Sequence, residues 1–162
     1  MHIVKAFEIA KAQVSDLELV LAGSADGRYG ANVLAHIKNS RYASSVKCLG
    51  RVSKEKKIEL MQRSWLIAAA SVKEGWGLIV TEAASQGTPA VVYNVDGLRD
   101  SVKDGETGIV CEANTPENMA KNIVKLLGNK EEYARLRRAG WEWSKEINFE
   151  NSYRQFIEKI NG

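Results

Sequence analysis

Hydrophobic and polar positions along the chain form two alternating kinds of segment. One kind is a short and nearly continuous apolar run, which is typical of a strand buried on both faces of a sheet. Such runs occur at Leu17–Ala22, Val46–Leu49, Trp65–Ala70, Ala90–Tyr93 and Gly108–Cys111.

The second kind of segment repeats its apolar residues with the period of an α-helix. Such segments are Ile3–Ala12, Tyr29–Ile37, Lys54–Arg63, Leu78–Gln86 and a short piece at Leu98–Lys103. A further helix is predicted to begin after the N-cap Thr115, with Pro116 at its first position, and to end at Gly128. A last amphipathic helix is predicted from the spacing of Tyr153, Phe156, Ile157 and Ile160.

Strands that alternate with helices over short connections build a parallel sheet with helices on both faces. The predicted fold class is therefore α/β, a Rossmann-like doubly wound sheet. Ligands of such sheets bind beyond the carboxyl ends of the strands. The loops that deserve inspection are those after Ala22, Leu49, Ala70 and Tyr93.

Composition excludes several classes of protein. The 162 residues are 44% hydrophobic, which suits one globular domain, and no apolar run is long enough to span a bilayer. The net charge of +3 is too small to indicate nucleic-acid binding, and the basic run Lys54, Lys56 and Lys57 is more typical of a solvated helix face. Cys48 and Cys111 lie apart in apolar runs, which excludes a disulfide framework and a zinc site and indicates a cytoplasmic protein.

The loop after the third apolar run carries the clearest chemical signal. It reads Glu74-Gly75-Trp76-Gly77-Leu78 and leads directly into a predicted helix. The glycines allow a tight turn and a close approach of the backbone to a ligand, and the amides at a helix N-terminus favour an anion. The spacing therefore predicts a phosphate or diphosphate site, although it matches neither the dinucleotide-binding fingerprint nor a Walker motif.

Two acidic residues, Glu74 and Glu82, flank this turn. A carboxylate accepts hydrogen bonds from hydroxyl groups, so an acid on each side of a phosphate site suits a sugar or a ribose. Acids are also favoured near helix starts when no ligand is present. From spacing alone, both interpretations stay open.

The stretch 74–92 reads EGWGLIVTEAASQGTPAVV and resembles the E-x7-E signature of retaining GT-B glycosyltransferases of glycosyltransferase family 4. The family's usual form begins EGFGL and continues with EAMA and a G-x-P-V turn. Leu19–Gly27, Val46–Ser53 and the stretch 96–110 resemble further family segments in the same order. The resemblance therefore extends over nearly the whole chain.

This resemblance implies the C-terminal, donor-binding domain of a two-domain enzyme that transfers a hexose from a nucleotide diphosphate sugar of the UDP or GDP type. Glu74 would be catalytic and would contact the donor sugar near its reacting face, and Glu82 would bind the ribose hydroxyls. The residues whose amides would meet the donor sugar and the diphosphate are Gly75, Trp76, Gly77 and Leu78.

Four more residues follow from the same resemblance. Val52, with Arg51 before it, would bracket the nucleobase, although an exposed arginine at a strand end is as often simply solvated. Gly23 and Gly27 are turn residues by type and would line the donor cleft. The resemblance implies no cofactor and no metal ion, because helix amides and basic side chains would neutralise the leaving diphosphate.

The chain departs from the family's pattern at its beginning. Members open this domain with a strand that ends in G-R-x4-K-G, whose Arg and Lys neutralise the donor diphosphate, whereas Met1–Phe7 matches the helix after that strand. We therefore expect residues 1–162 to be a single nucleotide-sugar-binding domain, present as a fragment or as half of a split enzyme. The acceptor domain would lie in cis or on a partner chain.

The absent strand would belong between Leu17–Ala22 and Trp65–Ala70. Those two strands would then close up, accept a segment from a second molecule, or leave a gap, and a clean monomer is the least favoured outcome because open strand edges recruit partners.

Two other functions stay open at this point. A non-catalytic binding or assembly subunit would explain the absent Arg–Lys pair, whereas the intact Glu74 and Glu82 favour an enzyme. A nucleotide-sugar epimerase on the same fold is the third candidate. The full enzyme would act on a glycan, lipid or polysaccharide precursor, with peripheral membrane contact left open.

Overall fold

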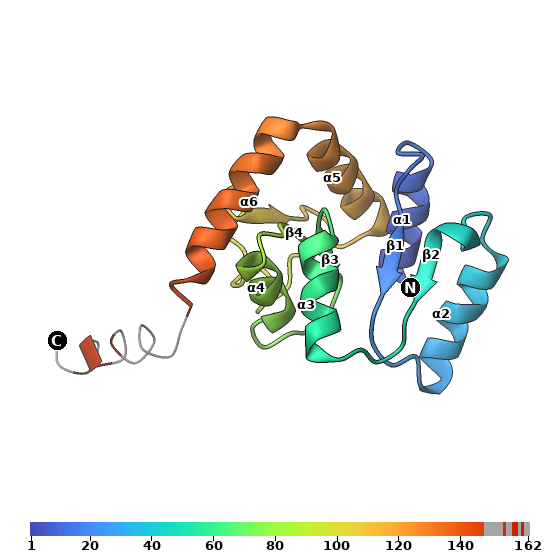
Figure 1. The fold of residues 1–162 in the computed structure, drawn as a ribbon, viewed down its shortest axis with the longest axis horizontal. Helices are drawn as coiled ribbons and strands as arrows, with labels where there is room; N and C mark the ends of the chain where they lie inside the picture. The colour runs from blue at the N-terminus through green and yellow to red at the C-terminus, as the bar shows by residue number, and fades with distance from the viewer. Residues whose placement is uncertain (148–153, 155–156, 159, 161–162) are drawn as a thin grey trace.

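Figure 1 shows the fold of the chain in the computed structural model, which describes residues 1–147, 154, 157, 158 and 160. Within these residues every pair of strands is parallel. The strands are β1 (Leu19–Leu21), β2 (Val46–Cys48), β3 (Ile67–Ala69), β4 (Ala90–Val92) and β5 (Gly108–Val110). Each one lies inside a predicted apolar run, and helices cover both faces, so the predicted α/β class is confirmed.

The described helices largely follow the prediction. They are α1 (His2–Lys11), α2 (Gly27–Asn39), α3 (Lys54–Arg63), α4 (Leu78–Ser85), α5 (Pro116–Gly128) and α6 (Lys130–Ser144), and a 3-10 turn η1 (Ala43–Ser45) precedes β2. Thr115 caps α5, because its side chain accepts a hydrogen bond from the Asn118 amide at 3.2 Å. No helix in this part of the chain is long and apolar enough to cross a membrane.

One prediction about helices was wrong, one helix was not predicted, and one predicted helix lies largely outside the described residues. Leu98–Lys103 forms turns rather than a helix, because Gly97 has a φ of +80° and its amide donates to the Asp100 side chain at 3.0 Å. Helix α6 was not predicted, because charged residues dominate its sequence. The predicted last helix rests partly on Tyr153 and Phe156, which lie outside the described residues.

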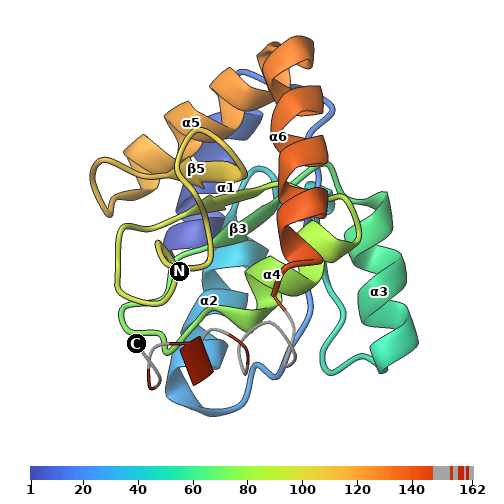
Figure 2. The ribbon, with the colours of Figure 1, turned by 90° about the vertical axis from the view of Figure 1, so that its left-hand side faces the viewer.

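The core lies around β4, whose three residues are all buried. Figure 2 shows α1 and α5 on one side of the three-stranded sheet and α3, α4 and α6 on the other. Fully buried side chains from both layers, such as Met119 and Leu126 of α5 and Leu136 of α6, complete this core. The strands β3, β4 and β5 are therefore held between two layers of helices.

The parallel strands form two sheets instead of one. Strand β1 pairs with β2, and β3, β4 and β5 form a separate sheet, with no pairing between β1 and β3 among the described residues. This division lies where the absent strand was predicted to belong, so the two neighbours have not closed up. Because β1 has an open edge, Val20 is 37% exposed, and the prediction that this strand is buried on both faces was wrong.

Hydrogen bonds show which backbone groups face the division. The Leu21 carbonyl of β1 accepts from the Leu49 amide at 2.9 Å, and the Ala69 carbonyl of β3 accepts from the Tyr93 amide at 3.0 Å. Neighbouring residues of a parallel strand present their backbone groups to opposite sides. The amides of Val20 and Ala68 therefore point toward the open edges.

Helix α1 connects the two sheets through side chains. It packs on α5 beside the three-stranded sheet, and its Phe7 ring meets the Tyr42 ring, near β2, with centroids 6.4 Å apart. Glu8 of α1 accepts hydrogen bonds from the Ser40 hydroxyl and from His36 Nε2, the latter at 3.0 Å. Burial alone would raise the pKa of Glu8, but these two bonds together hold it below its ordinary value.

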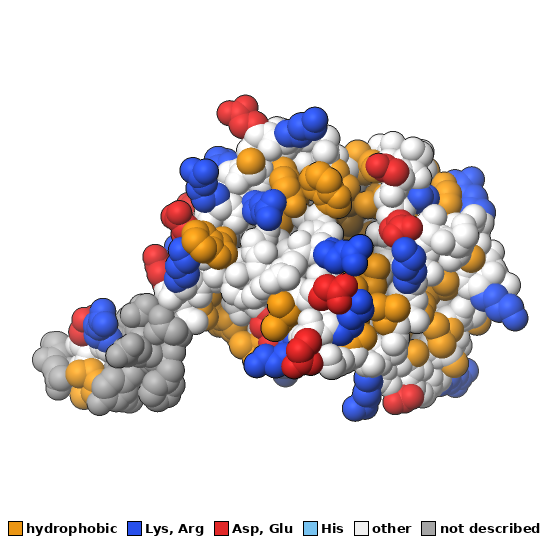
Figure 3. Space-filling view, viewed as in Figure 1, with side chains coloured by type: hydrophobic (Ala, Val, Ile, Leu, Met, Phe, Trp, Pro, Cys, Tyr) orange, Lys and Arg blue, Asp and Glu red, His pale blue; other side chains and the backbone are white. Residues whose placement is uncertain are grey.

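The surface carries charges of both signs. Figure 3 shows blue and red side chains interspersed over one face of the molecule rather than gathered into a basic patch. Several of them form ion pairs between exposed side chains, such as Lys47 with Glu18 and Lys56 with Glu59. Each such pair contributes little to stability because solvent screens it.

We expect amide hydrogen exchange to distinguish the open strand edges from the paired ones. The Val20 and Ala68 amides lack a strand partner, whereas the Leu21 amide points at β2 and the Val91 amide lies in the buried central strand. Exchange at Leu21 and Val91 should be about 10- to 100-fold slower, measured by native-state exchange with NMR detection. Equal protection of Val20 and Leu21 would show that another segment covers the edge of β1.

Candidate functional site

Loops from the carboxyl ends of the strands meet in two places. After β1 and β2, the Gly23 amide donates to the Gly50 carbonyl at 2.7 Å. After β3 and β4, Gly97 packs against the backbone of Glu74 and Gly75. The predicted site residues therefore lie on two pairs of joined loops, one pair for each sheet.

Glu74 is half-buried in the loop between β3 and α4, and groups of its own loop orient its carboxylate. The Ser71 hydroxyl donates to Glu74 Oε2 at 3.2 Å, and the Gly75 amide donates to Oε1 at 3.3 Å. Each oxygen thus has one donor and keeps acceptor capacity for a further one. A hydroxyl group of a ligand can bind there without displacing either contact.

Gly77 begins α4 and needs to be glycine. Its φ is +73°, in the left-handed region, and a Cβ there would lie 2.9 Å from Ser101 Oγ and 3.0 Å from Leu98 Cδ2. As the N-cap it offers no side-chain hydrogen bond, and its carbonyl accepts from the Val80 amide at 2.8 Å, so the amides before Val80 have no side-chain cap. The start of α4 therefore presents amide donors where the helix dipole favours an anion.

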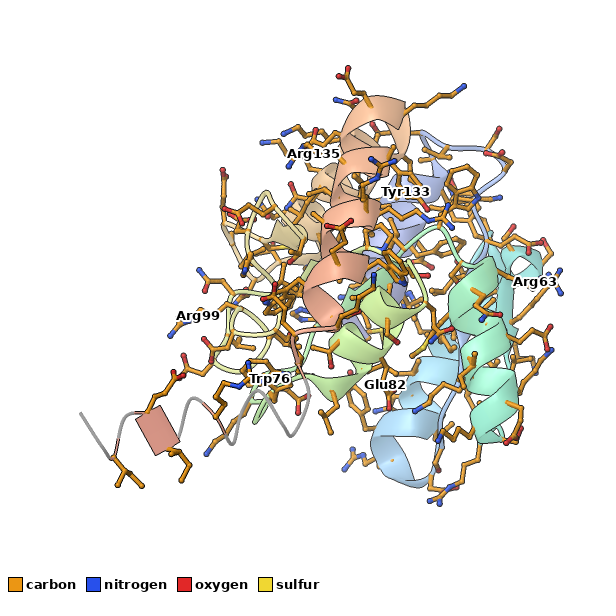
Figure 4. All side chains as sticks on the ribbon, turned by 60° about the vertical axis from the view of Figure 1, so that its left-hand side comes forward. Arg63, Trp76, Glu82, Arg99, Tyr133 and Arg135 are labelled. Carbon is orange, nitrogen blue, oxygen red and sulfur yellow. The ribbon has the colours of Figure 1, made fainter. Side chains whose placement is uncertain are left out.

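Exposed apolar side chains surround this turn. Val72 is 95% exposed and Leu78 68%, and Trp76 and Ile79 are each 38% exposed. Trp76 projects from the start of α4 in Figure 4. The predicted donor turn and the residues next to it thus carry four exposed apolar side chains, here called the turn patch: Val72, Trp76, Leu78 and Ile79.

Glu82 lies on the exposed side of α4 toward α3, and its carboxylate has a partner from that helix (Figure 4). Lys57 Nζ lies 2.7 Å from Glu82 Oε2, which makes a hydrogen-bonded ion pair between the two helices. No sequence pattern indicated this contact, because Lys57 belongs to the basic run that we interpreted as a solvated helix face. Only the packing of α3 on α4 brings the two residues together.

The residues predicted for the nucleobase lie just before α3. Arg51 is exposed and Val52 is half-buried, and Ser53 caps the helix by accepting from the Lys56 amide at 3.2 Å. Gly27 begins α2 with a φ of +80°. Within the described residues no hydrogen bond or ion pair joins any of them to Glu74 or Glu82, and their roles stay predictions.

The loop after β4 carries a further polar contact. Tyr93 follows β4, and its hydroxyl lies 2.8 Å from His2 Nδ1. Burial above all raises the pKa of Tyr93 to about 12, so this phenol stays protonated at neutral pH.

A groove of about 920 Å³ lies away from the predicted site, beside α1 and the end of α2, and none of the predicted site residues lines it. The described residues contain no cluster of His, Cys, Asp and Glu that could hold a metal ion.

Gly97 supports the Glu74 loop, and its replacement tests that role. We expect Gly97→Ala to lower the free energy of unfolding by about 2 kcal/mol more than Gly105→Ala. Both glycines have positive φ values, +80° and +70°, so both variants carry backbone strain. Only at Gly97 would the new Cβ lie 2.4 Å from the Glu74 carbonyl oxygen, whereas nothing lies within 4 Å at Gly105.

Urea unfolding of the two variants measures this difference. Equal losses of stability would show that the Glu74 loop moves away from Gly97 at no cost, and that the contact does not support the site.

Comparison with known proteins gives the family. Residues 1–143 match the family model described as glycosyl transferases group 1. Among curated proteins, the chain is 31% identical over 129 residues to N-acetyl-alpha-D-glucosaminyl L-malate synthase of Bacillus anthracis, a match that covers 80% of this chain and 32% of that protein. The chain thus spans about a third of the length of this curated relative.

Solved structures give the same fold. HepE of Anabaena, in complex with UDP-glucose, has a TM-score of 0.80 at 21% identity, over 96% of this chain and 44% of that one. The pneumococcal O-GlcNAc transferase GtfA, in complex with UDP and GlcNAc, has a TM-score of 0.82 at 18% identity, over 99% of this chain and 32% of that one. The chain has the fold of these GT-B enzymes, and it belongs to the glycosyl transferases group 1 family.

Proposed function

We propose that residues 1–162 form the donor-binding half of a retaining glycosyltransferase of family 4. The enzyme would transfer a hexose from a nucleotide diphosphate sugar to a glycan, lipid or polysaccharide precursor. The structures of HepE and GtfA contain UDP, which favours UDP over GDP as the nucleotide. The acceptor domain would lie outside these residues, in cis or on a partner chain.

One arrangement carries this proposal: a helix N-terminus that has no side-chain cap and has a carboxylate on each side. The amides that follow Gly75 would meet a diphosphate, Glu74 precedes the turn, and Glu82 lies one to two turns into α4. A nucleotide diphosphate sugar has hydroxyl groups at both ends and two phosphates between them. The order of carboxylate, amides and carboxylate matches the order of sugar, diphosphate and ribose.

The chemical step would be driven by electrostatic stabilisation. As the bond between the anomeric carbon and the diphosphate breaks, negative charge grows on the leaving phosphate oxygen, where the α4 amides would stabilise it. Glu74 would hold the donor sugar, and the acceptor hydroxyl would attack from the face that the diphosphate leaves, passing its proton to the leaving phosphate oxygen. Further cations for the diphosphate would come from a segment outside residues 1–162.

The turn patch supports the proposal that another domain covers this edge. Apolar side chains as exposed as Val72 and Leu78 are costly to leave in water when several lie together, and such surfaces often mark an interface. A covering domain would also exclude water from the diphosphate and so strengthen the electrostatic stabilisation. Donor and acceptor would then meet between the two domains.

Replacing the two acids separately tests their roles in the intact enzyme. Glu82→Ala should raise the donor KM about 10- to 100-fold, because the ribose hydroxyls lose their bonds to a charged group. Glu74→Ala should instead lower kcat, because its contact is to the reacting sugar. Glu18→Ala is the control, since Glu18, just before β1, forms a Lys–Glu pair of the same 2.7 Å length with Lys47 of β2. An unchanged donor KM in Glu82→Ala would refute the ribose assignment.

Residues 1–162 alone should transfer no sugar. Holding donor and acceptor together can contribute about 7–11 kcal/mol to catalysis, and this chain would supply only the donor side. The measurement is a transfer assay with purified chain, donor and acceptor, in which hydrolysis of the donor sets the background. Turnover above that background would show that the acceptor site lies within these residues.

A further inference from the structure

The ion pair between Lys57 and Glu82 joins two helices that belong to different parts of the proposed donor site. Lys57 lies in α3, which begins just after the predicted nucleobase residues, and Glu82 lies in α4, behind the phosphate turn. The side chains are 36% and 45% exposed, so a ligand in solvent can reach them. A second polar contact, from Gln62 Nε2 to Gln86 Oε1 at 2.8 Å, lies farther along the same two helices.

The neighbouring lysine behaves differently. Lys56 Nζ bonds both oxygens of Glu59, at 3.0 and 2.9 Å, and so remains on its own helix. Successive residues on a helix point in directions about 100° apart, which turns Lys57 toward α4 while Lys56 stays on the solvent side. The basic run thus contains one residue that reaches the proposed site from a neighbouring element.

The ion pair uses only part of the carboxylate. Lys57 donates to Oε2, and a carboxylate has acceptor positions for about four donors on its two oxygens. Without a partner, an exposed glutamate samples many rotamers, and a ligand must order it at an entropic cost. With Lys57 in place, that ordering precedes ligand binding, and the remaining acceptor positions stay available for hydroxyl groups.

We propose that Lys57 is a positioning residue for the nucleotide: it orients the Glu82 carboxylate to accept both ribose hydroxyls. This inference rests on the proposed function, since it requires Glu82 to bind ribose. Lys57 acts through Glu82 and makes no contact of its own with the reacting atoms. Its loss therefore weakens nucleotide binding and leaves the chemical step unchanged.

Calorimetric titration of the intact protein with UDP or GDP, whichever binds more tightly, tests this role. Lys57→Met should weaken binding about 3- to 10-fold, the cost of ordering one mobile side chain. Lys57→Arg keeps a cation in reach of Glu82 and should restore most of the affinity. The matched control is Lys47→Met, which removes a Lys–Glu pair of the same 2.7 Å length between β2 and Glu18, just before β1, and should leave binding unchanged.

A second nucleotide separates positioning from a simple charge effect. With the 2′,3′-dideoxy nucleotide diphosphate, which has no ribose hydroxyls for Glu82, the difference between Lys57→Met and the unmodified protein should disappear. A loss of the same size for both nucleotides would show that Lys57 acts on the phosphate charge, and it would overturn the proposal. Thermal unfolding of each variant shows whether the fold is retained.

Binding measurements on the Glu82→Ala variant distinguish the ribose role of Glu82 from the positioning role of Lys57. If Lys57 acts through Glu82, then adding Lys57→Met to Glu82→Ala should weaken binding no further. If Glu82→Ala weakens binding and Lys57→Met does not, the positioning role is wrong and the ribose assignment stands. If Glu82→Ala itself leaves nucleotide affinity unchanged, the proposed function fails, and the role of Lys57 fails with it.

Discussion

A parallel strand is stable when a neighbouring strand pairs with each of its edges, and this requirement determines how the two sheets of the molecule are built. Strand β4 has partners on both edges and is fully buried, whereas β1 and β3 each have one partner and one open edge. The three-stranded sheet and the helices that cover it therefore form a well-packed core, whereas the two-stranded sheet depends on contacts with other elements. Helix α1 supplies those contacts through Phe7 and Glu8, whose side chains replace the backbone ladder that would otherwise connect the two sheets.

The same division runs through the candidate site. The two carboxylates and the turn Gly75–Gly77 belong to the three-stranded sheet, with Glu74 on the loop after β3 and Glu82 on α4, whereas the predicted nucleobase residues follow β2. In the proposed complex, the spacing between the nucleobase site and the ribose site would therefore depend on how α3 lies against α4. An exposed ion pair such as Lys57–Glu82 contributes little to stability, but this one joins the two helices on which that spacing would depend.

Sequence patterns predicted the elements whose position depends on neighbouring residues in the chain. Apolar runs located all five described strands, and Thr115 with Pro116 located the start of α5. The helix and the ion pair that we did not predict both depend on contacts between residues far apart in the sequence. Helix α6 has few apolar residues, but Gly140 lets it approach so closely that a Cβ there would lie 3.0 Å from the Thr107 carbonyl oxygen. The contact of Lys57 with Glu82 depends in the same way on the packing of two helices, which one sequence does not reveal.

Pre-orientation of polar groups explains how so small a domain could bind a flexible, doubly charged ligand. Among the described residues every buried side-chain polar atom has a hydrogen-bond partner, so the unused acceptors and donors lie at the surface. At the candidate site those groups already have partners or a fixed place: Glu74 bonds Ser71 and the Gly75 amide, Glu82 bonds Lys57, and the α4 amides follow the left-handed turn at Gly77. Binding would then add contacts to an ordered surface, and the entropy of ordering it would already be spent in folding.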